Sequence, residues 1–168
     1  LDEQGRDVLT FVPGEVPGVD VEEGFRSDEL LASVARLLRR LHAASEGYVP
    51  TEEPFPGRPF VPGESELVGH MDATPQNVAV RDGEAAGLID FDLARPTTRL
   101  LDAYNTAMHW VPLRAPQDLD YELTMGDQLG RLRVFADASG WSDTERARIP
   151  ALGAEAAELS WSRMKERA

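Results

Sequence analysis

One segment in the middle of the chain constrains the fold more than any other. Residues 77–91 read NVAVRDGEAAGLIDF, which is two short β-like runs joined by Asp82-Gly83. An Asp-Gly pair readily adopts the two positive φ angles that a two-residue hairpin turn requires. We therefore predict a small, tight β-hairpin, whose two ends must lie side by side.

Polar side chains stand at both ends of this predicted hairpin. His70 and Asp72 precede the first strand, Asn77 opens it, and Asp90 follows the second strand. Because the ends meet, we expect Asn77 and Asp90 to be neighbours, and an amide oxygen beside a carboxylate suits Mg²⁺. Asp72 could then orient a hydroxyl group and accept its proton. These are the parts that phosphoryl transfer needs.

The rest of the chain is mostly helical in pattern. Ser27 can cap a helix over about 27–45 that has a continuous stripe of Leu and Val. Further helices are predicted from about residue 97, over about 120–137 with an end near Gly140, and after a capping box formed by Ser142 and Glu145. We predict a hairpin over 1–12 that includes the strand DVLTF, then a turn-rich linker, and an irregular loop over 46–66.

Composition narrows the class of protein. A chain of 168 residues with 42% hydrophobic residues can form one domain with a real core. A formal net charge of −13 argues against a nucleic-acid partner and favours cationic small molecules. With no cysteine, no apolar run of membrane-spanning length and no leader-like start, we expect a cytoplasmic protein without a membrane partner. The chain opens with Leu1 inside a strand-like pattern, which indicates a piece of a longer protein.

The polar motif has a family resemblance. His70-x-Asp72-x₄-Asn77, followed by Ile89-Asp90-Phe91-Asp92, resembles the catalytic and metal loops of the aminoglycoside phosphotransferase family, which is similar to the protein kinases. The segments LLRRLHAAS and RLLDAYNTAMHWVPL also fit that family. The resemblance covers most of the chain and is weakest beyond about residue 116.

The resemblance implies a predominantly helical α+β fold, namely a protein-kinase-like C-terminal lobe with a small central hairpin. Residues 1–22 would be the last N-lobe strand and the hinge, and residues 23–168 the C-terminal lobe, with the N-lobe largely missing. Met71 and the Thr97-Thr98 pair depart from the family's usual residues without removing a reacting group.

The resemblance also implies roles for individual residues. Asp72 would be the catalytic base, with Asn77 and Asp90 as Mg²⁺ ligands. Asp102 would brace the catalytic loop through backbone N–H groups, although it could equally be an acidic residue in the first turn of a helix.

The remaining assignments concern the surroundings of that centre. His70 would pack under the loop as a structural residue. Asp92 would lie next to the metal ligands and support them without binding the ion directly. The backbone of Thr10, Phe11 and Val12 would bind adenine. Trp110 fits core packing better than a substrate platform. A set of acidic residues is either a solvated helix face or part of a cation-binding surface: Asp118, Asp120, Glu122, Asp127, Glu155 and Glu158.

These assignments predict transfer of a phosphoryl group from ATP or GTP, with Mg²⁺, to a hydroxyl of a small, cationic molecule. Lys165 is the only lysine and lies too late in the chain to grip the phosphates, and no phosphate-covering loop is present, so we expect the chain alone to be inactive. The alternatives are a catalytically inactive, ligand-binding kinase remnant and a metal-dependent phosphohydrolase using Asp90 and Asp92. Self-association through the face left by a missing N-lobe is also expected.

Overall fold

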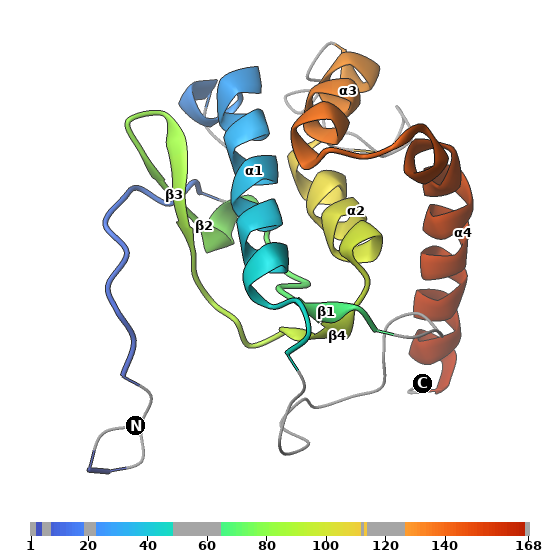
Figure 1. The fold of residues 1–168 in the computed structure, drawn as a ribbon, viewed down its shortest axis with the longest axis horizontal. Helices are drawn as coiled ribbons and strands as arrows, with labels where there is room; N and C mark the ends of the chain where they lie inside the picture. Colours follow the sequence, from blue (N-terminus) through green and yellow to red (C-terminus); the bar gives the residue numbers. More distant parts are fainter. Residues whose placement is uncertain are drawn as a thin grey trace.

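A computed structural model describes residues 3–4, 8–18, 23–48, 65–111, 113 and 127–166. These residues form an α+β fold with two small antiparallel sheets, which agrees with the predicted fold class at that level. Helix α1 lies between the β2–β3 hairpin and α2, helix α3 packs chiefly against α1, and α4 lies on the side of α2 away from α1 (Figure 1). The elements are a short 3₁₀ turn η1 (Glu23–Phe25), α1 (Asp28–Ala44), β1 (Leu67–Gly69), a 3₁₀ turn η2 (Pro75–Asn77), β2 (Val78–Arg81), β3 (Glu84–Leu88), β4 (Arg95–Thr97), α2 (Arg99–Trp110), α3 (Gln128–Ser139) and α4 (Asp143–Glu166).

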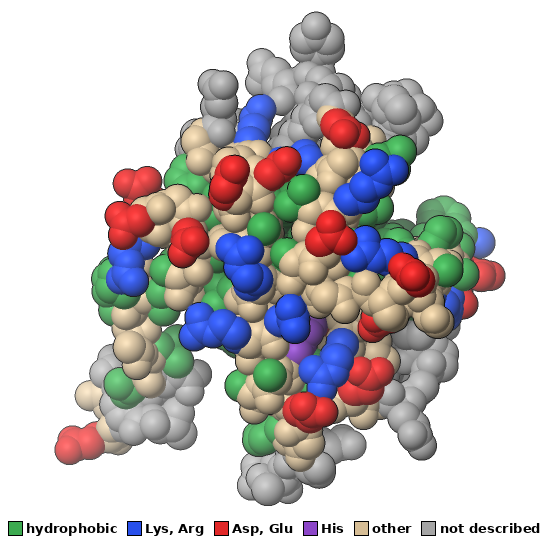
Figure 2. Space-filling model, turned by 45° about the horizontal axis from the view of Figure 1, so that its top comes forward, with side chains coloured by type: hydrophobic (Ala, Val, Ile, Leu, Met, Phe, Trp, Pro, Cys, Tyr) green, Lys and Arg blue, Asp and Glu red, His purple; other side chains and the backbone are tan. Residues whose placement is uncertain are grey.

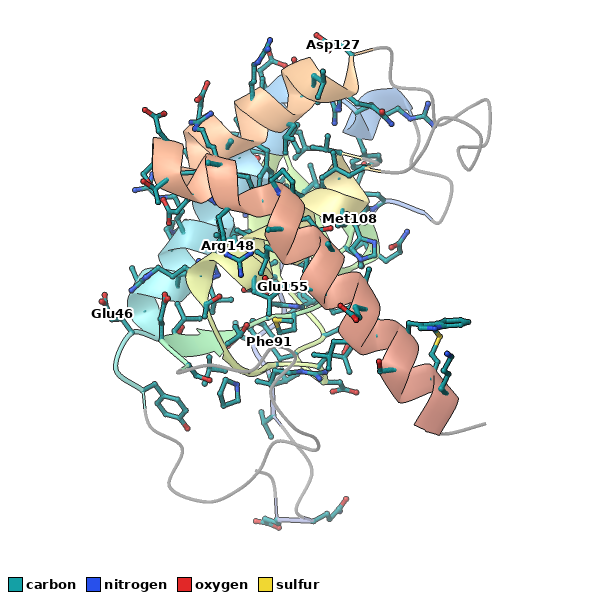
Figure 3. All side chains as sticks on the ribbon, turned by 90° about the vertical axis from the view of Figure 1, so that its right-hand side faces the viewer. Glu46, Phe91, Met108, Asp127, Arg148 and Glu155 are labelled. Carbon is teal, nitrogen blue, oxygen red and sulfur yellow. The ribbon has the colours of Figure 1, made fainter. Side chains whose placement is uncertain are left out.

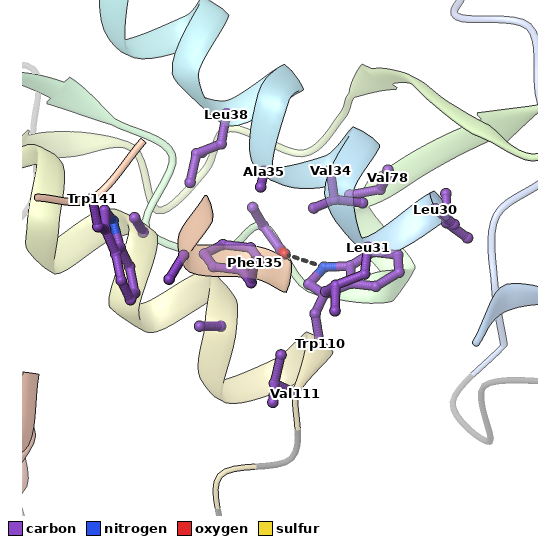
Figure 4. Packing of buried hydrophobic residues seen from close by; sticks show 14 of the residues in the cluster. Leu30, Leu31, Val34, Ala35, Leu38, Val78, Trp110, Val111, Phe135 and Trp141 are labelled. Atoms are coloured by element: carbon purple, nitrogen blue, oxygen red, sulfur yellow. Dashed lines mark hydrogen bonds between the residues drawn. The ribbon is translucent and has the colours of Figure 1, made fainter. Parts of the chain in front are cut away.

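Helix α1 is the central element of the core. Ser27 caps it, accepting a hydrogen bond from the Leu30 N–H at 3.1 Å, as the sequence predicts. Its buried stripe packs against Phe135 of α3, whose ring meets Trp141 edge-on with centroids 5.8 Å apart (Figure 4). The apolar residues of α1 therefore form one core with the residues of α2, α3 and the hairpin.

The hairpin predicted from the sequence is confirmed. Asp82 and Gly83 have φ angles of 54° and 77°, and β2 pairs with β3 on either side of them. The pairing shifts register between Ala79 and Val80, so that Ala86 stands unpaired as a β-bulge. Ser33 of α1 accepts a hydrogen bond from the Ala85 N–H at 2.8 Å and thereby fastens the hairpin to the central helix.

The strand predicted over DVLTF is not formed in its described part, since residues 8–13 belong to no helix or strand. Pairing begins two residues later, where Glu15 exchanges two 2.7 Å backbone hydrogen bonds with Val80 of β2. Gly14 makes this approach possible, because a Cβ at this position would lie 2.8 Å from the Val80 carbonyl oxygen. The edge of β2 thus pairs with Glu15, which follows the predicted strand, and not with the predicted strand itself. The first half of the predicted hairpin lies largely outside the described residues.

The pair β1–β4 was not predicted. Both strands are three residues long, and Pro96 stands in the middle of β4 opposite Val68, so neither segment has the alternation that marks a strand. Most of the loop predicted over 46–66 lies outside the described residues, and β1 begins directly after it.

The later helices follow the predicted pattern with shifted bounds. Helix α3 ends at Gly140, whose φ of 71° is the left-handed conformation favoured after a helix. Residues 120–126 of the long helix predicted there lie outside the described part of the chain. The capping box at α4 is confirmed, since Glu145 accepts from Ser142 and the Glu145 N–H donates back to the Ser142 hydroxyl. No described helix is both long enough and apolar enough to cross a bilayer.

Candidate functional site

Helix α2 carries a row of side chains that form hydrogen bonds with backbone N–H and C=O groups of the loop over residues 70–73. Asp102, which is fully buried, accepts hydrogen bonds from the His70 N–H at 3.1 Å and from the Met71 N–H at 2.7 Å. One turn further, the Asn105 amide donates to the Met71 carbonyl at 2.7 Å. A buried carboxylate that accepts backbone N–H groups fixes both the position and the direction of the loop.

Trp110 completes this row at the end of the helix. Its side chain is 2% exposed, and its indole N–H donates to the Ala73 carbonyl at 2.9 Å (Figure 4). The expectation of core packing is therefore confirmed. Trp110 also holds the loop at the end opposite Asp102.

Asp102 has a third partner behind the loop. His42 Nε2, on α1, lies 2.8 Å from Asp102 Oδ2, and both side chains are buried. Because the carboxylate can only accept, His42 carries its proton on Nε2. Gly69 leaves room for this arrangement, since a Cβ there would lie 2.7 Å from the Asp102 carboxyl carbon and 2.6 Å from Thr97 Cγ2. The carboxylate is therefore surrounded by α1, β1 and α2.

His70 connects the two loops at the ends of the hairpin. Its Nδ1 accepts from the Asp72 N–H at 3.3 Å, and its Nε2 lies 3.0 Å from the Ile89 carbonyl oxygen. The first partner can only donate and the second can only accept, so the ring is the neutral tautomer with the proton on Nε2. The ring also packs against Phe91, with centroids 4.5 Å apart. The His70 ring therefore contacts both loops, while the His70 N–H is bound by Asp102 of α2.

Asp72 and Asn77 are in direct contact. The Asn77 amide nitrogen donates to Asp72 Oδ2 at 2.9 Å and to the Asp72 carbonyl oxygen at 2.8 Å. Both partners are acceptors, so the amide must present its NH₂ to Asp72 and direct Oδ1 elsewhere. Among the described residues, Asn77 Oδ1 then has no hydrogen-bond partner, and Asp72, which is half-buried, keeps a second carboxylate oxygen.

Asp90 stands at the other end of the hairpin, next to the residue that faces Asn77. The Ile89 N–H donates to the Asn77 carbonyl oxygen at 3.0 Å, which extends the β2–β3 pairing by one step. Met71 and Asp90 both have left-handed backbones, with φ angles of 61° and 60°. Such conformations are costly for residues other than glycine, and outside turns they concentrate at functional sites.

The carboxylates of Asp90 and Asp92 are exposed and have no hydrogen-bond or ion-pair partner among the described residues. Within the described chain, no three His, Asp or Glu side chains are gathered into a metal centre. Of the residues at the two ends of the hairpin, Asn77 and Asp90 offer an amide oxygen and a carboxylate that could serve as protein ligands of a divalent ion. These hard oxygen donors fit Mg²⁺, which keeps several waters and takes few protein ligands.

The segment over Thr10, Phe11 and Val12 runs beside the hairpin. A Cβ on Gly87 would lie 2.7 Å from Val12 Cγ1, so Val12 packs directly over this glycine of β3. Thr10 is exposed and the Phe11 side chain is 82% exposed. Of the segment expected to bind adenine, Val12 is therefore adjacent to the strand that leads to Asp90.

Of the acidic residues predicted as a set, the three that the structure describes lie on or at the start of α3 and α4. Asp127 caps α3, accepting from the Gly130 N–H at 2.8 Å, and Glu155 pairs with Arg148 on α4 (Figure 3). Glu158 is exposed on the same helix. Asp118, Asp120 and Glu122 lie outside the described residues. Lys165 lies over the Trp161 ring near the end of α4, at 5.0 Å from its centroid.

Three contributors were missed at the sequence level. His42 was visible only as part of a leucine-rich helix, Asn105 as one polar residue of α2, and Gly69 as one of fourteen glycines. His42 and Asn105 could have been recognised as candidates because each is a polar residue on the otherwise apolar face of its helix. Such a residue must find a partner when it is buried.

Comparison of the sequence with known proteins finds a matching family model and a similar protein. Residues 56–135 match the model of the phosphotransferase enzyme family. The trifolitoxin immunity protein of Rhizobium leguminosarum bv. trifolii is 36% identical over 100 residues, a match that covers 57% of this chain and 36% of the relative. The chain thus spans little more than a third of the relative that it matches. The resemblance drawn from the sequence is confirmed, since the matched residues 56–135 contain both loops.

Proposed function

We propose that this chain carries the catalytic loop and the metal loop of an ATP-dependent phosphotransferase that acts on a hydroxyl group of a small molecule. The observation that carries the proposal is the contact between Asp72 and Asn77 at one end of a hairpin whose other end leads to Asp90. The family match over both loops supports it. The α+β fold with its helical core is compatible with a kinase-like C-terminal lobe.

Asp72 is assigned the role of base. Its Oδ2 accepts the Asn77 amide, and its remaining oxygen is available to accept the proton of the acceptor hydroxyl and to orient that hydroxyl toward the donor phosphate. The peptide group that precedes Asp72 is held by His70, which accepts its N–H, and by Asn105, which donates to its carbonyl oxygen. This rigidity would keep the carboxylate in one orientation, which is the main requirement of a reaction that depends on positioning.

Asn77 Oδ1 and Asp90 are assigned to Mg²⁺, and the segment over residues 10–12 to the adenine base. When bound, the ion would neutralise charge on the transferred phosphoryl group. The net charge of −13 favours a cationic acceptor.

The name of the similar protein suggests an acceptor class. It records immunity to a toxin, and phosphorylation of a hydroxyl is one chemical route to such immunity. We propose that the acceptor belongs to the toxins or antibiotics that a cell neutralises. Expression in a sensitive host, with this chain joined to a segment that supplies the phosphate-gripping lysine, should then raise resistance in a manner abolished by Asp72→Asn.

Nucleotide binding tests the site itself. With Mg²⁺, ATP or GTP should raise the melting temperature, because a ligand that binds only the folded state stabilises it. Asp90→Asn should abolish that shift, whereas Asp92→Asn, a matched change two residues away, should leave most of it. A chain without any Mg²⁺-dependent shift would contradict the proposed site.

Product analysis separates the alternatives. Transfer to an acceptor hydroxyl supports the phosphotransferase. Phosphate release without an acceptor, with Asp90→Asn and Asp92→Asn equally damaging, would support the phosphohydrolase instead. Nucleotide binding without either product would support an inactive, ligand-binding kinase remnant.

A further inference from the structure

A cavity lies on the helical side of the molecule, away from the two loops. It has a volume of about 260 Å³ and is bordered by α1, the start of α2, the turn between α3 and α4, and the start of α4. None of its lining residues belongs to residues 70–77 or 88–92. The cavity is therefore distinct from the candidate phosphotransfer site.

The cavity combines an apolar floor with a basic rim. Leu38, Leu100, Ala103 and Trp141 provide apolar surface, and Trp141 is 8% exposed. A small cavity of this kind suits the apolar body of a ligand, and polar groups at its edge would fix the ligand's orientation.

Arg39 is the free cation at this rim. No carboxylate of the described residues lies within ion-pair distance of it, and its one protein contact there is a long hydrogen bond of 3.4 Å to the Ala138 carbonyl oxygen. Its guanidinium lies over Gly140, where a Cβ would be 3.3 Å from Arg39 Cζ. Most of its donors are therefore available to a ligand.

The other charges at the rim are already engaged. Arg99 pairs with Glu46 at 2.9 Å, and Glu145 accepts both the N–H and the hydroxyl of Ser142 at 2.7 Å. Figure 2 shows Arg and Lys side chains interspersed with Asp and Glu side chains on one face of the molecule. With Arg99 paired, Arg39 is the group at this rim that is best placed to attract an anion.

We propose that this cavity binds a small organic anion, with its apolar part against Trp141 and its carboxylate on Arg39. Benzoate is a suitable probe, because it has a flat apolar body and one carboxylate. Benzyl alcohol, which has nearly the same shape and no charge, is its matched control. Binding is measured without nucleotide, so the result does not depend on the proposed phosphotransfer.

The test is a titration followed by the ¹H–¹⁵N signal of the Trp141 indole in the full chain. Benzoate should shift this signal in a saturable manner, and benzyl alcohol should bind at least about tenfold more weakly. Arg39→Gln should weaken benzoate by about tenfold, the effect of losing a charge-assisted hydrogen bond. Arg36→Gln, an exposed change on the same helix outside the cavity, should leave the affinity within about twofold.

Two further variants keep the proposal falsifiable if the effect of Arg39 is small. Ala43 is exposed at the cavity rim, so Ala43→Phe should block binding without lowering the melting temperature. Glu145→Gln should strengthen binding, because it removes the negative charge at the rim. No saturable shift of the Trp141 signal, equal affinities for benzoate and benzyl alcohol, or equal effects of Arg39→Gln and Arg36→Gln would each overturn the proposal.

Discussion

Asp102 accepts the Met71 N–H at 2.7 Å, although the two residues are 31 positions apart in the chain. The same carboxylate accepts the His70 N–H and the His42 imidazole. One buried side chain therefore determines where the loop before Asp72 begins and how it relates to the central helix α1.

Asp102→Asn should strongly destabilise the protein. An amide has one acceptor oxygen where the carboxylate has two, so at least one buried donor loses its partner. The expected loss is about 2–4 kcal/mol in the free energy of unfolding, measured by urea denaturation. Asp92→Asn is the control, because Asp92 is exposed and has no partner among the described residues. Equal stability of the two variants would show that Asp102 does not hold the loop.

Gly69→Ala should be costly although it adds a single methyl group. The new Cβ would lie 2.7 Å from the Asp102 carboxyl carbon, so the carboxylate or β1 must move. We expect a loss of about 1–3 kcal/mol in the free energy of unfolding. Gly24→Ala, at a position where a Cβ meets nothing within 4 Å, should be close to neutral. A Gly69→Ala variant as stable as Gly24→Ala would mean that the close contact is relieved at no cost.

The capping box of α4 should give a pH-dependent contribution to stability. Hydrogen bonds from the Ser142 hydroxyl and N–H lower the pKa of Glu145 from its ordinary value of 4.5. A carboxyl whose pKa is lower in the folded state stabilises that state above its unfolded pKa, and the contribution is lost as the pH falls through the folded pKa.

The wild type and Glu145→Gln should therefore differ by a constant amount above about pH 5.5, on the order of 0.5–1 kcal/mol. This difference should decrease as the pH falls below 4.5, the ordinary value. Denaturant titrations at several pH values provide the measurement. A difference that stays constant down to pH 3 would exclude the Glu145 carboxylate as its source.

The segment before Glu15 exposes apolar side chains. Val8, Leu9 and Phe11 are 70%, 84% and 82% exposed. A cluster of exposed apolar side chains favours association, so we predict self-association of this chain that depends on concentration. Sedimentation velocity should detect it, and Leu9→Ser with Phe11→Ser should reduce it. Trp161→Ser, which alters another exposed apolar residue on α4, serves as the control. A monomer at all concentrations would contradict the prediction.

The sequence predicted the hairpin and the helix caps because each depends on neighbouring residues. Asp82-Gly83, Ser27 and the pair Ser142 and Glu145 act within a turn or less of the chain, so spacing alone reveals them. The sequence also predicted that the polar residues of the two loops would be close. The loops are joined by His70 and by the backbone pairing of Asn77 with Ile89.

The parts that could not be predicted depend on contacts between distant segments. The pair β1–β4 has no alternation of its own, and it forms because its two short strands meet below α2 (Figure 1). The His42–Asp102 pair joins residues 60 positions apart, and neither residue shows a local signal of its partner. The strand predicted over DVLTF failed for the same reason, since β propensity does not supply a partner strand.

The unpaired residue Ala86 has a consequence for how this hairpin can change during evolution. Near the turn, Arg81 is paired with Glu84, and without the bulge this register would place Asn77 opposite Leu88. The bulge at Ala86 shifts the register by one residue, so that Asn77 lies opposite Ile89. An insertion or deletion between residues 85 and 90 would turn every later side chain to the opposite face and separate Asp90 from Asn77. A change of length at the turn itself would leave the pairing of β2 with β3 unchanged, so homologous chains should vary in length there and keep the count of residues beyond it.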